Sequence, residues 1–136
     1  MIKGFKQFSE EKSKSVVFTF GRFNPPTTGH EKLLIKVASL AIGNDYKIFA
    51  SQSSDPKKNP LDYKEKVILM RKIFPKHGRN IVYDKKIKNA IDALVYLYNA
   101  GYTKATMVVG ADRISDFKSL LNKYNGVKAR HGFYEF

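Results

Sequence analysis

The sequence has 136 residues, no cysteine, a formal net charge of +13 and a pI near 9.9. This length suits one domain with a single buried core, and the lack of cysteine excludes disulfides and thiolate metal sites. Residues 1–15 lack the apolar core of a signal peptide, and no run approaches the roughly 20 apolar residues of a membrane helix, so we expect a cytoplasmic protein.

The basic charge favours an anionic partner, but it does not choose among nucleic acid, a membrane surface and a phosphorylated small molecule. The lysines are spread along the chain, with dense patches at residues 57–58 and 85–88. A solvated surface is the simplest explanation of any single lysine. The three histidines are scattered, so a structural zinc site is not expected.

The first predicted strand covers residues 15–20, an uncharged run of β-branched and aromatic side chains that suits a strand buried on both faces. Residues 21–30 (GRFNPPTTGH) follow it. Thr28 and Glu31 have the T-x-x-E spacing of a capping box, which predicts a helix over residues 29–42. Two prolines stiffen the approach, and the free amides of the first helical turn favour an anion. The segment therefore indicates a phosphate-binding loop.

The rest of the chain alternates strands and helices. Further strands are predicted over residues 46–51, 80–83 and 105–109, and further helices from Asp62 to before Pro75, from Asn89 to Gly101, and from Ile114 to Tyr124. Apolar residues at helical spacing predict the buried faces of the first two helices, namely Leu33, Leu34, Val37, Leu40 and Ala41, then Val67, Ile68, Met70 and Ile73.

This alternation predicts right-handed crossovers and an α/β fold, with a parallel sheet and helices on both faces. Ligands of such sheets bind beyond the carboxyl ends of the strands, where the strand order reverses. The loops after the first and fourth strands are therefore the expected site. They also carry the most unusual chemistry, GRFNPPTTGH and GADR.

Residues 21–30 resemble the signature of the nucleotidylyltransferase superfamily, whose T/H-x-G-H motif follows the first strand. They are most similar to the adenylyltransferases that act on nicotinamide mononucleotide or phosphopantetheine. Thr27 takes the first motif position and His30 the last. The resemblance, which covers residues 15 to about 124, implies a three-layer Rossmann-like fold of the HUP type. The length implies one domain over residues 1–136, in which we expect residues 1–14 to be frayed. The resemblance also implies transfer of a nucleotidyl group, with ATP as the expected donor, to a phosphorylated small-molecule acceptor with release of pyrophosphate.

The resemblance also assigns roles within this loop. The expected catalytic residues are His30, which would stabilise the charge developing at the α-phosphate, and Thr27, which would help hold the triphosphate. The expected nucleotide-binding residues here are Gly21, Arg22, Phe23, Asn24 and Gly29. Such a displacement depends on positioning and charge stabilisation more than on covalent chemistry. Mg²⁺ is the expected cofactor, held mainly through the triphosphate, and no residue is assigned as a metal ligand.

Residues 110–117 (GADRISDF) resemble the G-x-D-x-x-x-x-F segment that follows the fourth strand in the family. Gly110 and Asp112 would face the ribose and base of the nucleotide, and Arg113 would reach a phosphate. The alternative is a plain strand-to-helix turn in which Asp112 caps the helix. Phe117 is expected in the core under either interpretation.

Three basic residues are further candidates for binding the acceptor's phosphate. Lys57 and Lys58 lie in the polar loop after the second strand, where the family has a basic residue, and Arg71 lies on the second helix. His77 and His131 have no motif around them and are expected at the surface.

The family also carries an I-S-x-T/S-x-x-R motif beyond a fifth strand, and no such pattern follows residue 130. Either the sequence is a fragment or shortened form, or Arg113 and the lysines do part of that motif's work. A non-catalytic nucleotide-binding module is therefore an alternative function. A basic nucleic-acid-binding domain is a second alternative, although the aromatics lie in strands or at helical core spacing, without a stacking platform. Nucleic acid and membranes are not expected partners, and the sequence leaves a homo-oligomer open.

Overall fold

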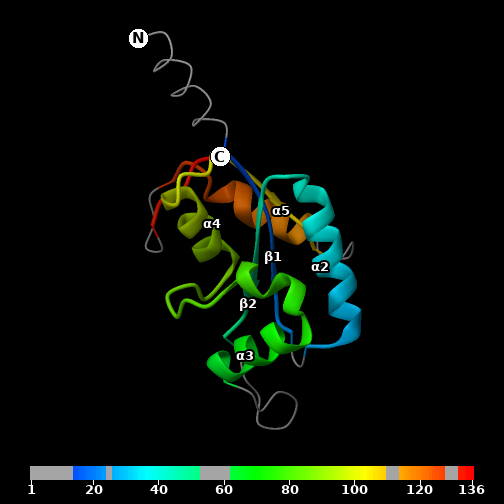
Figure 1. Ribbon diagram of the computed structural model, residues 1–136. Helices are drawn as coiled ribbons and strands as arrows, with labels where there is room; N and C mark the ends of the chain where they lie inside the picture. Colours follow the sequence, from blue (N-terminus) through cyan, green and yellow to red (C-terminus); the bar gives the residue numbers. More distant parts are fainter. Residues whose placement is uncertain (1–13, 24–25, 53–61, 110–113, 128–131) are drawn as a thin grey trace, which may run out of the picture.

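The computed structural model describes residues 14–23, 26–52, 62–109, 114–127 and 132–136, and the described strands form one parallel sheet (Figure 1). The strands are β1 (Ser15–Gly21), β2 (Asp45–Ala50), β3 (Ile81–Val82) and β4 (Lys104–Met107). Their order is β3-β2-β1-β4, and every neighbouring pair is parallel. The strand order therefore reverses between β1 and β4, where an α/β sheet binds its ligands.

Helices cover both faces of this sheet, so the predicted α/β, Rossmann-like arrangement is confirmed. The α-helices are α2 (Thr28–Ala41), α3 (Tyr63–Ile73), α4 (Ala90–Asn99) and α5 (Ile114–Lys123), and a short 3₁₀ helix, η1 (Pro75–Asn80), follows α3. Among the described helices, none combines the length and the apolar character that crossing a membrane requires.

Apolar clusters fill the spaces above and below the sheet, because successive strand residues point to opposite faces. On one face, Val16, Phe18 and Phe49 pack against Leu94 and Leu97 of α4, with Leu121 of α5 at the margin. On the other, Ile48 and Ala50 pack against Leu34 of α2 and against Val67 and Met70 of α3. The residues after β1 and β2 are thus held mainly by α2 and α3.

Local capping signals are confirmed for two helices. The side chain of Asp62 accepts a hydrogen bond from the backbone N–H of Glu65 at 2.8 Å, and α3 starts at the next residue. The side chain of Asn89 accepts one from Asp92 N at 2.9 Å, and α4 starts at Ala90. In both cases a polar side chain satisfies an amide that the helix itself leaves without a partner.

Some predicted apolar faces are wrong. Leu40 of α2 is 44% exposed, and Ile68 and Ile73 of α3 are 44% and 36% exposed. The reason is that each helix covers the sheet with a narrower stripe, at positions 34, 37 and 41 in α2 and at 63, 66, 67 and 70 in α3. The stripe of α3 includes a lysine, Lys66.

His77, expected at the surface, is instead buried within η1. Its Nδ1 lies 2.9 Å from the hydroxyl of Tyr46, at the start of β2. Burial lowers the pKa of His77 below the usual 6.5. The histidine therefore helps to pack the 3₁₀ helix against the sheet, which a scan for motifs does not predict.

Candidate functional site

The chain leaves β1 through a backbone bend that buries an aromatic ring. Phe23 has a φ of 50°, a left-handed conformation that costs a non-glycine residue energy, and its side chain is almost fully buried. A Cβ on Gly21 would lie only 3.0 Å from Cε2 of Phe23. Glycine is therefore needed at position 21 because the ring of Phe23 folds back over it.

The helix α2 begins with a capping interaction between Thr27 and His30. The backbone N–H of Thr27 donates to Nδ1 of His30 at 2.9 Å, and the Thr27 hydroxyl oxygen lies 3.2 Å from the same nitrogen. The predicted capping box of Thr28 and Glu31 is thus displaced by one residue, and α2 starts at Thr28 rather than Gly29. The displacement arises because the imidazole of His30 takes the place of the usual carboxylate.

This geometry sets the tautomer of His30. Because Nδ1 accepts a backbone hydrogen bond, the neutral ring carries its proton on Nε2. The ring centroid lies 4.8 Å from that of Phe23, at an interplanar angle of 59°. Burial lowers the pKa of His30 below the usual 6.5, so the ring is neutral at pH 7. His30 therefore presents one N–H donor at the start of α2.

The backbone beside His30 is open enough for a ligand to approach. A Cβ on Gly29 would meet only Thr27 Oγ1, at 3.6 Å, among the described residues. The first amides of a helix have no partner within the helix, and the positive end of the helix dipole favours negative charge there. The backbone N–H of His30 itself donates to Thr27 O at 3.0 Å. The amides that precede it in the first turn, together with His30 Nε2–H, form a site suited to a phosphate group.

A buried lysine joins this loop to the neighbouring strand, and the sequence analysis missed it. Lys66 is fully buried, and its ammonium donates to the carbonyl oxygens of Arg22 and Ser51, each at 2.9 Å. Burial lowers the pKa of Lys66 to about 8. The sequence does contain a signal for this lysine. Lys66 lies three residues after Tyr63, on the helical face that is otherwise apolar.

The profile described as cytidylyltransferase-like matches residues 18–134, which include the second half of β1 from Phe18, the Thr27–His30 corner and all four described α-helices. The chain belongs to the cytidylyltransferase-like family. The resemblance to the nucleotidylyltransferase superfamily is thereby confirmed, and the family supports nucleotidyltransferase chemistry in general. No curated protein and no solved structure matches the chain.

The second motif of this cytidylyltransferase-like domain follows β4, which lies beside β1. The backbone N–H of Val108 donates to Phe18 O at 2.8 Å, and the buried hydroxyl of Thr19 donates to Val108 O at 2.6 Å. The chain is thus held along β1 as far as Val108. The nucleotide-binding residues predicted beyond it, Gly110, Asp112 and Arg113, lie outside the described residues.

The other predicted site residues are placed as follows. Arg22 is exposed in the loop after β1, whereas Asn24, Lys57 and Lys58 lie outside the described residues. Arg71 is in the last turn of α3, at the opposite end from the cap Asp62, and its guanidinium donates to Ile81 O at 2.7 Å. The structure thus brings Gly21, Arg22, Phe23, Thr27, Gly29 and His30 together, but it does not bring Arg71 to them.

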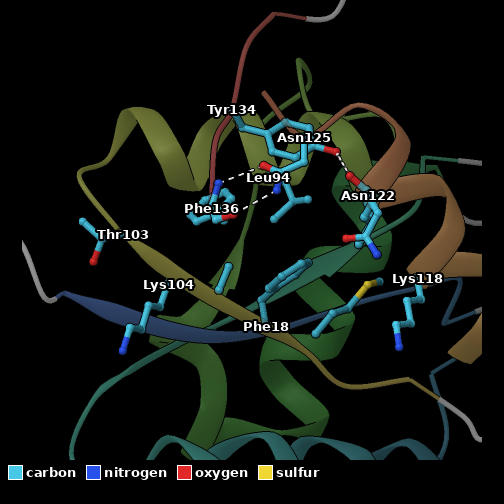
Figure 2. A pocket seen from close by; sticks show the side chains of 12 residues that line it. Phe18, Leu94, Thr103, Lys104, Lys118, Asn122, Asn125, Tyr134 and Phe136 are labelled. Atoms are coloured by element: carbon cyan, nitrogen blue, oxygen red, sulfur yellow. Dashed lines mark hydrogen bonds between the residues drawn. The ribbon is translucent and has the colours of Figure 1, made fainter. Parts of the chain in front are cut away.

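A cavity of about 360 Å³ lies elsewhere, between the β1–β4 side of the sheet, α4 and α5 (Figure 2). Its walls are mostly apolar, and Lys104, Lys118 and Asn122 stand at its rim. The side-chain amide of Asn125 donates to Phe136 O at 2.9 Å, and its Oδ1 accepts from the backbone N–H of Phe136 at 2.8 Å. Neither Thr27 nor His30 lines this cavity, so it is separate from the phosphate site.

Proposed function

We propose that this cytidylyltransferase-like domain transfers an adenylyl group from ATP to a phosphorylated small molecule and releases pyrophosphate. The observation that carries the proposal is the Thr27–His30 corner, where a neutral imidazole with its proton on Nε2 stands beside the free amides of α2. These donors suit phosphate oxygens, and the family supports nucleotidyltransfer.

In the proposed reaction, an oxygen of the acceptor's phosphate attacks the α-phosphorus of ATP. A new P–O bond forms, the bond between the α-phosphorus and the bridging oxygen breaks, and pyrophosphate leaves with that oxygen. Negative charge is redistributed over the α-phosphate oxygens and the leaving group during this displacement. His30 Nε2–H and the amides of α2 would stabilise that charge without forming a covalent intermediate.

The neutral state of His30 fits this role. Burial beside Phe23 lowers the pKa of His30, so the ring donates a hydrogen bond without first binding a proton. A bound triphosphate would act in the opposite direction, because nearby negative charge raises the pKa of a histidine. Protonation would place a proton on Nδ1, which accepts from Thr27 N–H, so we propose that the cap keeps the ring neutral when ATP binds.

We propose Mg²⁺ as the cofactor, bound through the triphosphate. In the described part of the chain, no group of three or more histidine or acidic side chains is placed to hold a metal ion. Magnesium commonly binds nucleotides through their phosphates. When bound, it would neutralise charge on the leaving pyrophosphate.

A basic loop after β3 supports a phosphorylated acceptor. Lys85, Lys86 and Lys88 are exposed there, at the carboxyl end of the sheet. Gln52, which follows β2, holds this loop through hydrogen bonds from its amide to the carbonyl oxygens of Lys85 and Ile87, each at 2.8 Å. The loop thus presents positive charge at the carboxyl end of the sheet, where β1 also ends. Arg71 is not included, because it binds Ile81 O.

The test is pyrophosphate release from ATP, CTP and GTP with Mg²⁺ and a panel of phosphorylated acceptors. We expect turnover with ATP, and a loss of about 10²–10³-fold in His30→Ala, as is common when a preorganised donor is removed. Ser39→Ala is the matched control, since Ser39 lies on the same helix and its hydroxyl donates only to Lys36 O among the described residues. Full turnover in His30→Ala would contradict the role of this residue, and turnover with CTP alone would contradict adenylyl transfer.

A further inference from the structure

We propose that Lys66 is a positioning residue, whose ammonium group holds the loop after β1 so that Phe23 fixes the imidazole of His30. The inference deepens the function proposed above, because it concerns the residue assigned to the phosphate. Lys66 itself is fully buried and acts through the backbone.

Lys66 carries its charge at a position that is normally apolar. Lys66 lies on the buried stripe of α3 with Tyr63, Val67 and Met70, where an apolar residue is the ordinary choice. Burying an ammonium group is costly unless hydrogen bonds compensate. Replacing a buried charge by an apolar side chain of similar size is often neutral or stabilising, so packing alone does not explain a lysine here.

The ammonium group of Lys66 links two distant segments of the chain. It donates to the carbonyl oxygen of Arg22, 44 positions earlier in the chain, and to that of Ser51, 15 positions earlier. Ser51 Oγ lies 3.5 Å from the same nitrogen. The last backbone bond between the two chain segments runs from Ser51 N to Gly21 O, at 2.8 Å. Lys66 therefore adds a link where β1 and β2 end.

The link made by Lys66 reaches His30 through Phe23. The carbonyl of Arg22 belongs to the peptide bond that leads into Phe23. Phe23 is held at a φ of 50° with its ring buried, and this ring contacts that of His30 at a centroid distance of 4.8 Å. Fixing the peptide bond between Arg22 and Phe23 thus fixes the wall against which the imidazole rests.

The experiment uses the pKa of His30 as a readout that needs no turnover. Proton NMR titration of the imidazoles is carried out on the wild type and on Lys66→Met, which keeps the length of the side chain but removes its donors. In Lys66→Met the loop is released, so the pKa of His30 should rise toward its usual 6.5 as the ring gains access to water. The pKa of His77, whose ring contacts Tyr46, should stay as in the wild type.

Lys64→Met is the matched control, because Lys64 is an exposed lysine on the same helix. It should leave both histidines unchanged. A folded Lys66→Met protein with the wild-type pKa of His30 would overturn the proposal. If Lys66→Met does not fold, Lys66→Gln replaces it, because glutamine retains an amide donor on a shorter side chain. A raised pKa of His30 is again the expected result, and an unchanged pKa would again overturn the proposal.

A double-mutant cycle separates this inference from the proposed function. Lys66→Met should lower turnover by about 10–100-fold, the size of effect that a small misplacement of a catalytic group produces. In a His30→Ala background the same substitution should cause little further loss, because its effect passes through His30. Fully additive losses would overturn the positioning role. If the wild type shows no turnover, the proposed function fails, while the pKa readout still decides the role of Lys66.

Discussion

The β1–β2 side and the β4 side of the sheet are packed differently. Beside β1 and β2, the loop that carries His30 is fixed by a buried ring, a backbone hydrogen bond and a buried lysine, and α2 and α3 place fully buried residues beneath it. Beside β4, none of the residues of α5 is buried, and residues of this helix line two cavities. This contrast indicates that the corner around His30, the proposed phosphate end of the site, is preorganised, whereas the β4 side is loosely packed.

The largest expected effect is on the stability of the well-packed side. Phe23→Ala should lower the free energy of unfolding by about 3–5 kcal/mol, because it removes a buried ring and leaves a cavity. Chemical denaturation monitored by circular dichroism measures this loss. A loss under about 1 kcal/mol would show that the loop after β1 is no better packed than α5.

A matched pair of glycines tests the same corner at smaller magnitude. Gly21→Ala should destabilise the fold by about 1–3 kcal/mol, because its Cβ would lie 3.0 Å from the ring of Phe23. Gly29→Ala should instead be neutral or stabilise α2 by up to about 1 kcal/mol, since its Cβ meets only Thr27 Oγ1 at 3.6 Å.

The same pair separates stability from binding when ATP affinity is measured by calorimetry. Gly29→Ala should weaken ATP binding although the fold is intact. The added methyl group would lie beside the free amides of α2 and hinder the approach of the triphosphate. Unchanged affinity in Gly29→Ala would place the triphosphate elsewhere.

The stability of the protein should rise between pH 8 and pH 10. Burial lowers the pKa of Lys66 from 10.5 to about 8, so in this range the unfolded chain binds a proton that the folded protein has released. More protons bound in the unfolded state means stability that increases with pH, here by an amount on the order of 1 kcal/mol. The buried tyrosines do not obscure this window, because the pKa values of Tyr63, Tyr102 and Tyr134 are raised and affect stability above pH 10. Thermal unfolding measured between pH 8 and pH 10 should show stability that rises with pH in the wild type and does not change with pH in Lys66→Met. The same rise in both proteins would exclude Lys66 as its source.

The smallest expected effect is on the β4 side. Leu120→Ala on α5 should change the free energy of unfolding by no more than about 0.5 kcal/mol, because the side chain is 39% exposed. Amide hydrogen exchange should also be faster in α5 than in α3, whose stripe is buried. Equal protection of the two helices would remove the contrast on which the comparison rests.

Particular residues show how far the sequence could go. The caps at Asp62 and Asn89 were predictable, because a cap depends on a side chain and an amide three residues away. The parallel sheet followed from the alternation of strands and helices. The cap of α2 was displaced by one residue because Thr27 and Thr28 are both suitable caps, and a histidine at the third position replaced the carboxylate that the pattern requires.

Other features depend on packing between distant segments. The periodicity of α5 resembles that of a buried helix, yet how much of its apolar face is covered depends on neighbours that the pattern does not specify. The environment of Lys66 is set by carbonyl oxygens 15 and 44 positions away, which no local pattern contains. The left-handed conformation of Phe23 is likewise a consequence of tertiary packing.

The most direct test of the central claim is to map ATP and Mg²⁺ onto the protein by NMR chemical-shift changes of the backbone amides. We predict the largest changes at Thr27, Gly29 and His30 and their loss in His30→Ala. Changes centred instead on Leu94, Lys118 and Asn122, around the cavity beneath α5, would contradict this prediction, as would the absence of any change at saturating ATP.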